Sequence, residues 1–280
     1  MLTTVLLPML EKSKGFQTIE DDPFWFRLEL LTDRHESETR AQINRIVKPG
    51  MIVLDIGAHV GYYTRLMSQL VGENGKVIAF EPHPRTFEVL HKNTANLKNV
   101  TLVQSAVAEE EGTAELYDYL MMSASGSLHY DEKLLDIQKA NVGDSDVAPR
   151  IQNEFPVEKF TVRTVPIDAL LSEMNIEAID FVKMDIEGAE MGALRGMKNL
   201  IANSPNINLI MEFNPSALKA FDVVPESAVA EVLGLGFSKV FVVNEDSSLV
   251  EITNKTQMIV DMTTRLMQHM DVVNLLFIRS

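Results

Sequence analysis

The chain has 280 residues, of which 46% are hydrophobic and 23% are charged, so it is long enough to form one large globular domain. It contains no cysteine, which excludes disulfides, thiolate nucleophiles and cysteine zinc sites. Its formal net charge of −15 argues against a nucleic-acid partner, because phosphate contacts need Lys and Arg.

The first predicted element is the apolar segment 1–10, which we expect to form a helix or strand that packs on the domain. It lacks a basic region, contains Pro8 and is shorter than the roughly 20 residues that span a bilayer. We therefore expect no membrane segment and a cytoplasmic location. Helical spacing over 32–47 predicts the next helix, which Pro49 and Gly50 end.

From residue 51 onward, hydrophobic spacing predicts strands and helices in near alternation. The predicted elements of the first half are strand 51–55, helix 62–71, strand 76–80, helix 84–96, strand 100–107 and strand 113–119. Those of the second half are strand 160–165, helix 167–174, strand 179–184, helix 189–201, strand 207–213, helix 226–235, a hairpin of 239–243 and 249–252, helix 254–267 with Asn254 as N-cap, and strand 272–278.

This alternation predicts an α/β fold with a mostly parallel sheet and helices on both faces. We expect a single domain over 1–280, with an N-terminal extension over 1–48. A segment at about 120–158 loses hydrophobic periodicity, so we interpret it either as a lid-like insertion or as a solvated loop without a role.

The most informative segment is 51–64, MIVLDIGAHVGYYT, in which an apolar strand leads through a small-residue turn into a helix. Dinucleotide-binding turns need three glycines in the pattern G-x-G-x-x-G, and this turn lacks the middle one. The pattern therefore favours S-adenosylmethionine, whose carboxylate can bind at the start of the helix. Asp55, just before the turn, either binds the ammonium group of the cofactor or orders the turn. The cofactor contacts predicted here are Asp55, Gly57, Ala58, His59, Gly61 and Thr64.

The next predicted strand ends at Glu81 and Pro82, where open α/β sheets bind ligands. A carboxylate at this place can accept hydrogen bonds from both ribose hydroxyls, so we assign Glu81 and Pro82 to the cofactor site. Ser105 and Ala106 end the third strand, where small residues allow a flat adenine ring to lie close.

A second group of acids follows the buried strand in VKMDIEGAE, over 182–190. Asp185 lies at the tip of this strand, and we assign it both a cofactor contact and the role of general base. Glu187 and Glu212 are further candidates for catalysis, and His59 and His83 lie near the same edge. We assign no metal ion, although Asp185, Glu187 and Glu212 are a candidate ligand set.

Four segments together resemble the FkbM-type methyltransferases: DIGAHVGYYT, AFEPHP, the SAV strand end and KMDIEGAE, in this order and spacing. The resemblance runs from about 39 to 213. It implies a Rossmann-like class I methyltransferase fold with a seven-stranded sheet, S-adenosylmethionine as cofactor, and methyl transfer to a hydroxyl of a sugar or other small metabolite. The family usually has Asn at the position of His59.

Two alternatives to an O-methyltransferase stay open on sequence alone. An NAD-dependent oxidoreductase is disfavoured by the missing glycine and by the lack of a Tyr-x-x-x-Lys pair at a sheet edge. A non-catalytic, methyltransferase-like module is disfavoured by the presence of all the expected acids and glycines. The sequence predicts a small-molecule acceptor without naming it, and it leaves a homo-oligomer open.

Overall fold

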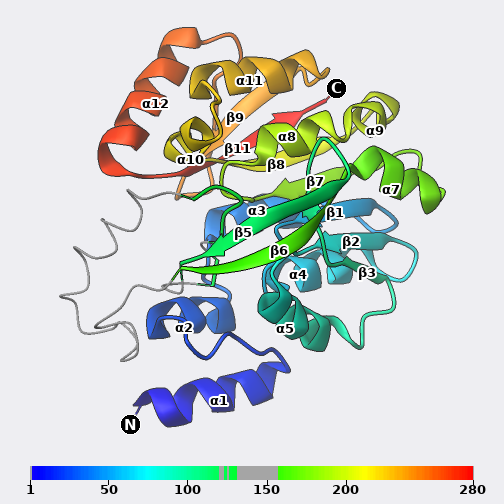
Figure 1. Ribbon diagram of the computed structural model, residues 1–280, viewed down its shortest axis with the longest axis vertical. Helices are drawn as coiled ribbons and strands as arrows, with labels where there is room; N and C mark the ends of the chain where they lie inside the picture. The colour runs from blue at the N-terminus through cyan, green and yellow to red at the C-terminus, as the bar shows by residue number, and fades with distance from the viewer. Residues whose placement is uncertain (1, 120–122, 125, 131–156, 280) are drawn as a thin grey trace.

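A mostly parallel sheet runs through the centre of the molecule (Figure 1). The computed structural model describes residues 2–119, 123–124, 126–130 and 157–279. Within these residues the main sheet has eight strands, which are, in order across the sheet, β10 (Leu249–Glu251), β9 (Lys239–Val243), β11 (Val273–Ile278), β8 (Asn208–Phe213), β7 (Phe181–Met184), β1 (Ile52–Ile56), β2 (Lys76–Phe80) and β3 (Val100–Val103).

The expected fold class, α/β with a mostly parallel sheet, is confirmed by the strand pairing. Strands β3, β2, β1, β7 and β8 are parallel to one another. Strand β11 lies antiparallel between β8 and β9, and β10 adds an edge strand to the seven that the resemblance implies. After β1 the chain forms β2 and β3 on one side of that strand, and it later forms β7 and β8 on the other side. Open α/β sheets bind their ligands at such a switch point, beyond the carboxyl ends of the strands.

The central strands β1, β7 and β8 are buried on both faces, and successive side chains point to opposite faces. On one face, Leu54 and Val182 belong to a core shared with α7 (Ile167–Glu173), α8 (Glu190–Arg195), α9 (Lys198–Asn203), α10 (Pro215–Ala220), α11 (Pro225–Gly234) and α12 (Thr256–His269). On the other, Val53 and Phe181 belong to a core shared with α1 (Leu2–Lys14), α2 (Phe24–Thr32), α3 (Ser37–Ile46) and α4 (Tyr62–Val71). Helix α5 (Pro84–Thr94) packs Leu90 near the glycine turn.

A second, smaller sheet has the order β4 (Ala106–Val107), β6 (Glu158–Val165) and β5 (Gly112–Asp118) (Figure 1). The prediction of one strand over 100–107 is therefore wrong. Strand β3 ends at Val103, the Ser105 amide donates to the Val103 carbonyl at 3.0 Å, and the residues that follow pair with β6. The turn at Ser105 thus carries the chain from one sheet to the other.

The helix predicted over 189–201 is interrupted, which corrects the second half of the sequence prediction. The Gly196 carbonyl accepts a hydrogen bond from the Asp168 amide at 2.9 Å, and a Cβ atom at Gly196 would lie 2.1 Å from the carbonyl oxygen of Ala108, so only glycine fits at this break. The Asp168 carboxylate accepts hydrogen bonds from the amides of Asn199 and Leu200, which starts α9 afresh.

Two further differences concern helix starts and helices that the pattern did not reveal. Asn254 is not an N-cap, because it has φ of 57° and α12 begins at Thr256, after Lys255. Helices α2 and α10 were not predicted, and α10 begins with an Asn214 cap whose side chain accepts from the Ala217 amide. Most of the insertion predicted over 120–158 lies outside the described residues. No helix in the described part of the chain is long and apolar enough to cross a membrane.

Candidate active site

A cavity opens at the carboxyl ends of β1, β2 and β7. The predicted site residues that line it are Gly57, His59, Glu81, Pro82, Ser105, Ala106, Asp185 and Glu187. Predicted site residues that do not line it are Asp55, Ala58, Gly61, Thr64 and Glu212. The fold therefore brings the two halves of the predicted site to one place.

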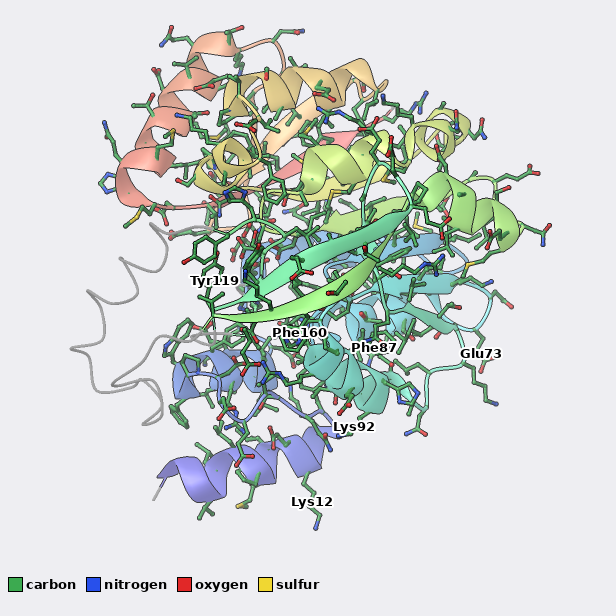
Figure 2. All side chains as sticks on the ribbon, in the orientation of Figure 1. Lys12, Glu73, Phe87, Lys92, Tyr119 and Phe160 are labelled. Atoms are coloured by element: carbon green, nitrogen blue, oxygen red, sulfur yellow. The ribbon has the colours of Figure 1, made fainter. Side chains whose placement is uncertain are left out.

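Part of the cavity wall is apolar and was missed by sequence reasoning. Phe80 and Val107 come from the ends of β2 and β4, Leu116 from β5, and Leu128 from the short described segment 126–130. Phe160 of β6, which Figure 2 labels, packs edge-on against the ring of His83, with ring centroids 4.6 Å apart. The small sheet thus contributes Ala106, Val107 and Leu116 to the wall of the cavity.

The glycine turn between β1 and α4 is fixed against the strands on both sides of β1. Gly57 has φ of 83°, and a Cβ atom there would lie 1.8 Å from the carbonyl oxygen of Asp185. The amides of Gly57 and Ala58 both donate to the Phe80 carbonyl, at 3.1 and 2.9 Å. Only glycine fits at position 57, because any side chain would displace the residue that follows β7.

Asp55 and Thr64 lie behind the turn. Both are fully buried, and the Thr64 hydroxyl donates to Asp55 Oδ2 at 2.5 Å. Burial raises the pKa of Asp55 to about 6, an effect that the Thr64 hydrogen bond and the Lys183 charge oppose. Of the two roles left open for Asp55, this geometry supports ordering of the turn.

Glu81 is a buried carboxylate that joins the two loops beside it. Its Oε2 accepts a hydrogen bond from the His59 amide and its Oε1 accepts one from the His83 amide, both at 2.9 Å. Burial raises the pKa of Glu81 to about 7, although both amides favour the charged form. Each oxygen keeps a second lone pair, so Glu81 can still accept two hydroxyl groups from a ligand in the cavity.

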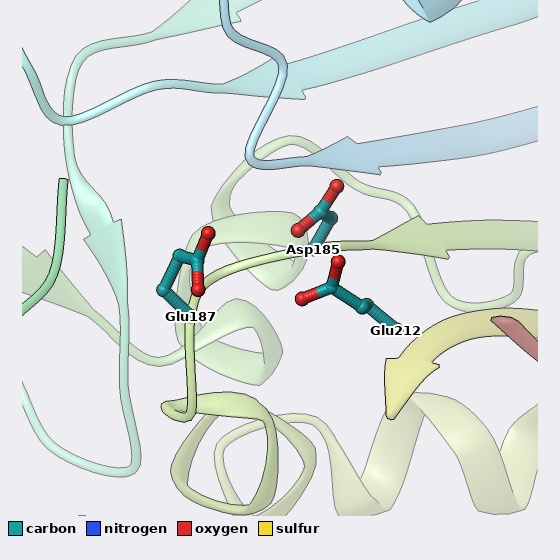
Figure 3. A group of neighbouring side chains, drawn as sticks. All are labelled: Asp185, Glu187 and Glu212. Carbon is teal, nitrogen blue, oxygen red and sulfur yellow. The ribbon is translucent and has the colours of Figure 1, made fainter. Parts of the chain in front are cut away.

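Three acids gather beside the glycine turn (Figure 3). Asp185 follows β7, Glu187 lies in the turn after it, and Glu212 is near the end of the adjacent strand β8. One oxygen from each carboxylate lies within 4.8 Å of the others. Burial raises the pKa of Glu187 to about 8, and burial together with Asp185 and Glu187 raises that of Glu212 well above its usual range.

Lys183 is a functional candidate that the sequence reasoning missed. It is buried, its Nζ donates to Asp185 Oδ2 at 2.6 Å, and the same nitrogen lies 5.0 Å from the ring centre of Tyr63. Burial by itself lowers the pKa of Lys183, but the carboxylates of Asp185 and Glu36 raise it overall. The sequence held a signal for Lys183, because it lies two residues before Asp185 and residues two apart in a strand point to the same face of the sheet.

Glu187 and Glu190 have different structural positions. Glu187 precedes α8 in a tight turn with φ of 53°, whereas Glu190 is the first residue of that helix. The buried Glu190 Oε1 accepts from the amides of Ile186 and Gly188, at 3.3 and 3.2 Å. Glu190 therefore holds the turn in place, while Glu187 lines the cavity.

His59 connects the glycine turn to segments far away in the sequence. Its Nε2 lies 2.6 Å from the Ser123 hydroxyl, which donates to Asp22 Oδ2 at 2.6 Å, so His59 acts as the donor to Ser123. Burial lowers the pKa of His59 to about 3, so the ring is neutral. His59 has φ of 50°, a region that Asn, Asp and His tolerate better than most residues. This preference gives a physical reason for the Asn that the family usually has there.

Several known proteins with similar sequences are named as methyltransferases. The chain is 26% identical over 148 residues to Methyltransferase 1 of Beauveria bassiana, covering 52% of this chain and 57% of the relative. It is 25% identical over 171 residues to 2-O-methyltransferase NoeI of Sinorhizobium fredii, covering 59% and 65%. It is 27% identical over 202 residues to 31-O-demethyl-FK506 methyltransferase FkbM of Streptomyces tacrolimicus, covering 69% and 75%. The matched part thus spans less than two thirds of the first two relatives.

Most of the described fold lies within a stretch that matches one known family of domains. A solved SAM dependent methyltransferase from Aquifex aeolicus covers 98% of both chains at 17% identity and a TM-score of 0.44, a likeness too low to carry an argument about function. The Methyltransferase FkbM domain matches residues 55–238, which contain the glycine turn, Glu81 and all three acids. This match disfavours an NAD-dependent oxidoreductase, and the chain belongs to the FkbM methyltransferase family.

Proposed function

We propose that this chain is an S-adenosylmethionine-dependent O-methyltransferase that acts on a hydroxyl of a sugar or other small metabolite. The observation that carries the proposal is the cavity in which Glu81, the Gly57 turn and the acids after β7 face one another. Family membership and the O-methyltransferase names of two relatives support it.

The residues of the cavity fit S-adenosylmethionine. The apolar wall that includes Val107 and Leu116 suits a flat adenine ring, and Ser105 lies beside it. Glu81 has lone pairs left for the two ribose hydroxyls. Gly57 and His59, which line the same cavity as the acids, would then hold the methionine end.

The chemistry follows from the acids near Asp185. S-adenosylmethionine supplies an electrophilic methyl group, so that a C–O bond forms as the C–S bond breaks and its electron pair stays on sulfur. A hydroxyl is a weak nucleophile, and a positioned base commonly contributes about 10²–10⁴ in rate. Lys183 binds one oxygen of Asp185, which leaves the other to accept the proton of the acceptor. The remaining contribution of the protein is to hold the acceptor in line with the methyl group.

Replacement of Glu81 by Gln tests the proposal. Gln has one acceptor oxygen and one NH₂ group, so one of the two backbone amides that Glu81 binds would face a donor. The ribose hydroxyls would also lose a charged acceptor. We expect the dissociation constant of S-adenosylhomocysteine, measured by titration calorimetry, to rise about 100-fold, since charge-assisted hydrogen bonds contribute about 1.5–3 kcal/mol each.

A matched control is Glu111→Gln, at an exposed residue that pairs with Arg163 outside the cavity. It should leave binding of S-adenosylhomocysteine unchanged. A wild-type chain that binds NAD but not S-adenosylhomocysteine would overturn the proposal. If S-adenosylhomocysteine binds but no methyl group reaches any acceptor in a broad panel of sugars and hydroxylated metabolites, a non-catalytic binding module becomes the better explanation.

The pKa of Glu81 predicts a pH dependence of cofactor binding. Because burial raises this pKa to about 7, the carboxyl is protonated below that pH, whereas hydroxyl donors from a ligand favour the charged form. Affinity for S-adenosylhomocysteine should therefore fall as pH falls from 7 towards 5, by up to about tenfold per unit, and level off above 7. Calorimetry across pH 5–8.5 should show this slope in the wild type and a flatter profile in Glu81→Gln.

Three broader features belong to the same proposal. The acceptor is a small molecule rather than a nucleic acid, which the net charge of −15 supports. The protein works in the cytoplasm, and self-association is compatible with its function. Gel filtration with light scattering would measure the oligomeric state.

A further inference from the structure

We infer that Asp185, Glu187 and Glu212 form a binding site for one divalent, oxygen-preferring cation beside the acceptor. The role given to the cation rests on the proposed function, since it places the ion next to the hydroxyl that is methylated.

The spacing of the three carboxylates suits a single ion. One oxygen from each residue lies within 4.8 Å of the other two. Ligands on opposite sides of Mg²⁺ are about 4.2 Å apart, and those around Ca²⁺ about 4.8 Å, from metal–oxygen distances of about 2.1 and 2.4 Å. Carboxylate oxygens are also the ligands that these cations prefer. Figure 3 shows the carboxylates turned towards one another from β8 and from the turn after β7.

Glu212 gives a separate indication that something binds here. The residue is 9% exposed, and its buried Oε2 has no hydrogen-bond partner among the described residues. Asn274, which pairs with Glu212 across β8 and β11, does not donate to this oxygen, because its side-chain NH₂ group donates to Glu36 Oε2. Burying a charged oxygen without a partner costs several kcal/mol, so such an oxygen normally faces a donor or a metal ion.

The charges around the cluster are unbalanced. Three carboxylates carry up to three negative charges, and the one cation that contacts them among the described residues is Lys183, which binds Asp185 alone. With all three carboxyl groups ionised, two negative charges at Glu187 and Glu212 would have no cation beside them. A divalent cation would balance both, and it would remove the repulsion between oxygens so close together.

The position of the cluster gives the ion a function. Asp185 and Glu187 line the cavity, whereas Glu212 supports the cluster from behind. A cation held by these residues would reach the cavity at Asp185 and Glu187, where it could bind the oxygen of the acceptor hydroxyl. Metal ions lower the pKa of a bound hydroxyl, so with the cation bound solvent water would be a sufficient base, and Asp185 would then serve as a ligand in place of its role as base.

Manganese is a direct probe of this site. Chelator-treated full-length protein should bind one Mn²⁺ per chain, counted by the loss of the free-ion signal in electron paramagnetic resonance. MgCl₂ or CaCl₂ should compete for the same site and raise the melting temperature. The substitution Glu212→Gln should weaken Mn²⁺ binding at least tenfold, while Glu111→Gln, far from the cluster, should leave it unchanged.

The Glu212→Gln variant also guards against a failure to fold. Gln has the same size and removes a buried charge, so the variant should melt at or above the wild-type temperature in chelator but gain nothing from MgCl₂. Absence of Mn²⁺ binding at millimolar concentration, or equal binding by wild type and Glu212→Gln, would overturn the inference. Titration of S-adenosylhomocysteine in chelator separates the two proposals: if it binds normally while Mn²⁺ does not, only the cation site fails.

Discussion

Replacing Gly57 by alanine is expected to abolish measurable binding of S-adenosylhomocysteine. The new Cβ would lie 1.8 Å from the Asp185 carbonyl, and φ of 83° is unfavourable for any residue with a side chain. The chain can relieve this clash only by moving the glycine turn away from the end of β7. That movement would disturb Glu81 as well, because the His59 amide in the same turn donates to it.

The control for this prediction is Gly192→Ala, in α8, where an added Cβ meets nothing within 4 Å. We expect Gly192→Ala to keep wild-type affinity and at least wild-type stability, since alanine favours helices over glycine by about 1 kcal/mol. Calorimetry and urea unfolding would compare the two variants. Retention of cofactor affinity within tenfold in Gly57→Ala would contradict the assignment of this turn to the cofactor site.

Replacing Asp185 by Asn is expected to lower kcat/KM for methyl transfer about 10³-fold. Asn keeps the size of the side chain but cannot accept the acceptor proton, which removes a contribution of about 10²–10⁴. A cation held by the cluster would also lose a charged ligand. The rate is measured as transfer of labelled methyl groups to the best acceptor found in a panel of sugars and small hydroxylated metabolites.

The matched control is Asp180→Asn, which makes the same substitution just before β7, at the end of the strand remote from the cavity. Asp180 accepts a hydrogen bond from the Ile52 amide, which Asn can also accept, so we expect a rate within twofold of the wild type. Asp185→Asn also leaves the Lys183 ammonium without its nearest partner, so stability must be measured alongside activity. A wild-type rate in Asp185→Asn would remove this residue from the mechanism.

The sequence predicted local elements well where apolar runs end at glycine, proline or an acid. The helix over 62–71 and the strand over 76–80 agree with α4 and β2 at both ends. The order of strands and helices was then enough to predict a mostly parallel sheet. Because parallel strands end at one edge, the sequence also predicted that Glu81 and Asp185 face one cavity, as they do.

Features that depend on contacts between distant segments were not predicted. The small sheet arises because residues 106 and 107 pair with β6, more than 50 residues later, and no local pattern marks such pairing. The break of the predicted helix at Gly196 is accompanied by hydrogen bonds to Asp168 of α7, a separate element. Likewise, the hydrogen-bonded chain from His59 through Ser123 to Asp22 joins three segments whose proximity exists only in the folded protein.

The position of β11 has a consequence for how the protein folds. This strand lies between β8 and β9 but follows both in the chain, so neither can complete its pairing until residues 273–278 arrive. During synthesis, two hydrophobic strand edges would therefore stay open, and open edges invite pairing with other chains. Glu212, near the end of β8, pairs with Asn274 of β11, so it would be held in place only after this last strand inserts. The candidate active site would therefore form late in folding.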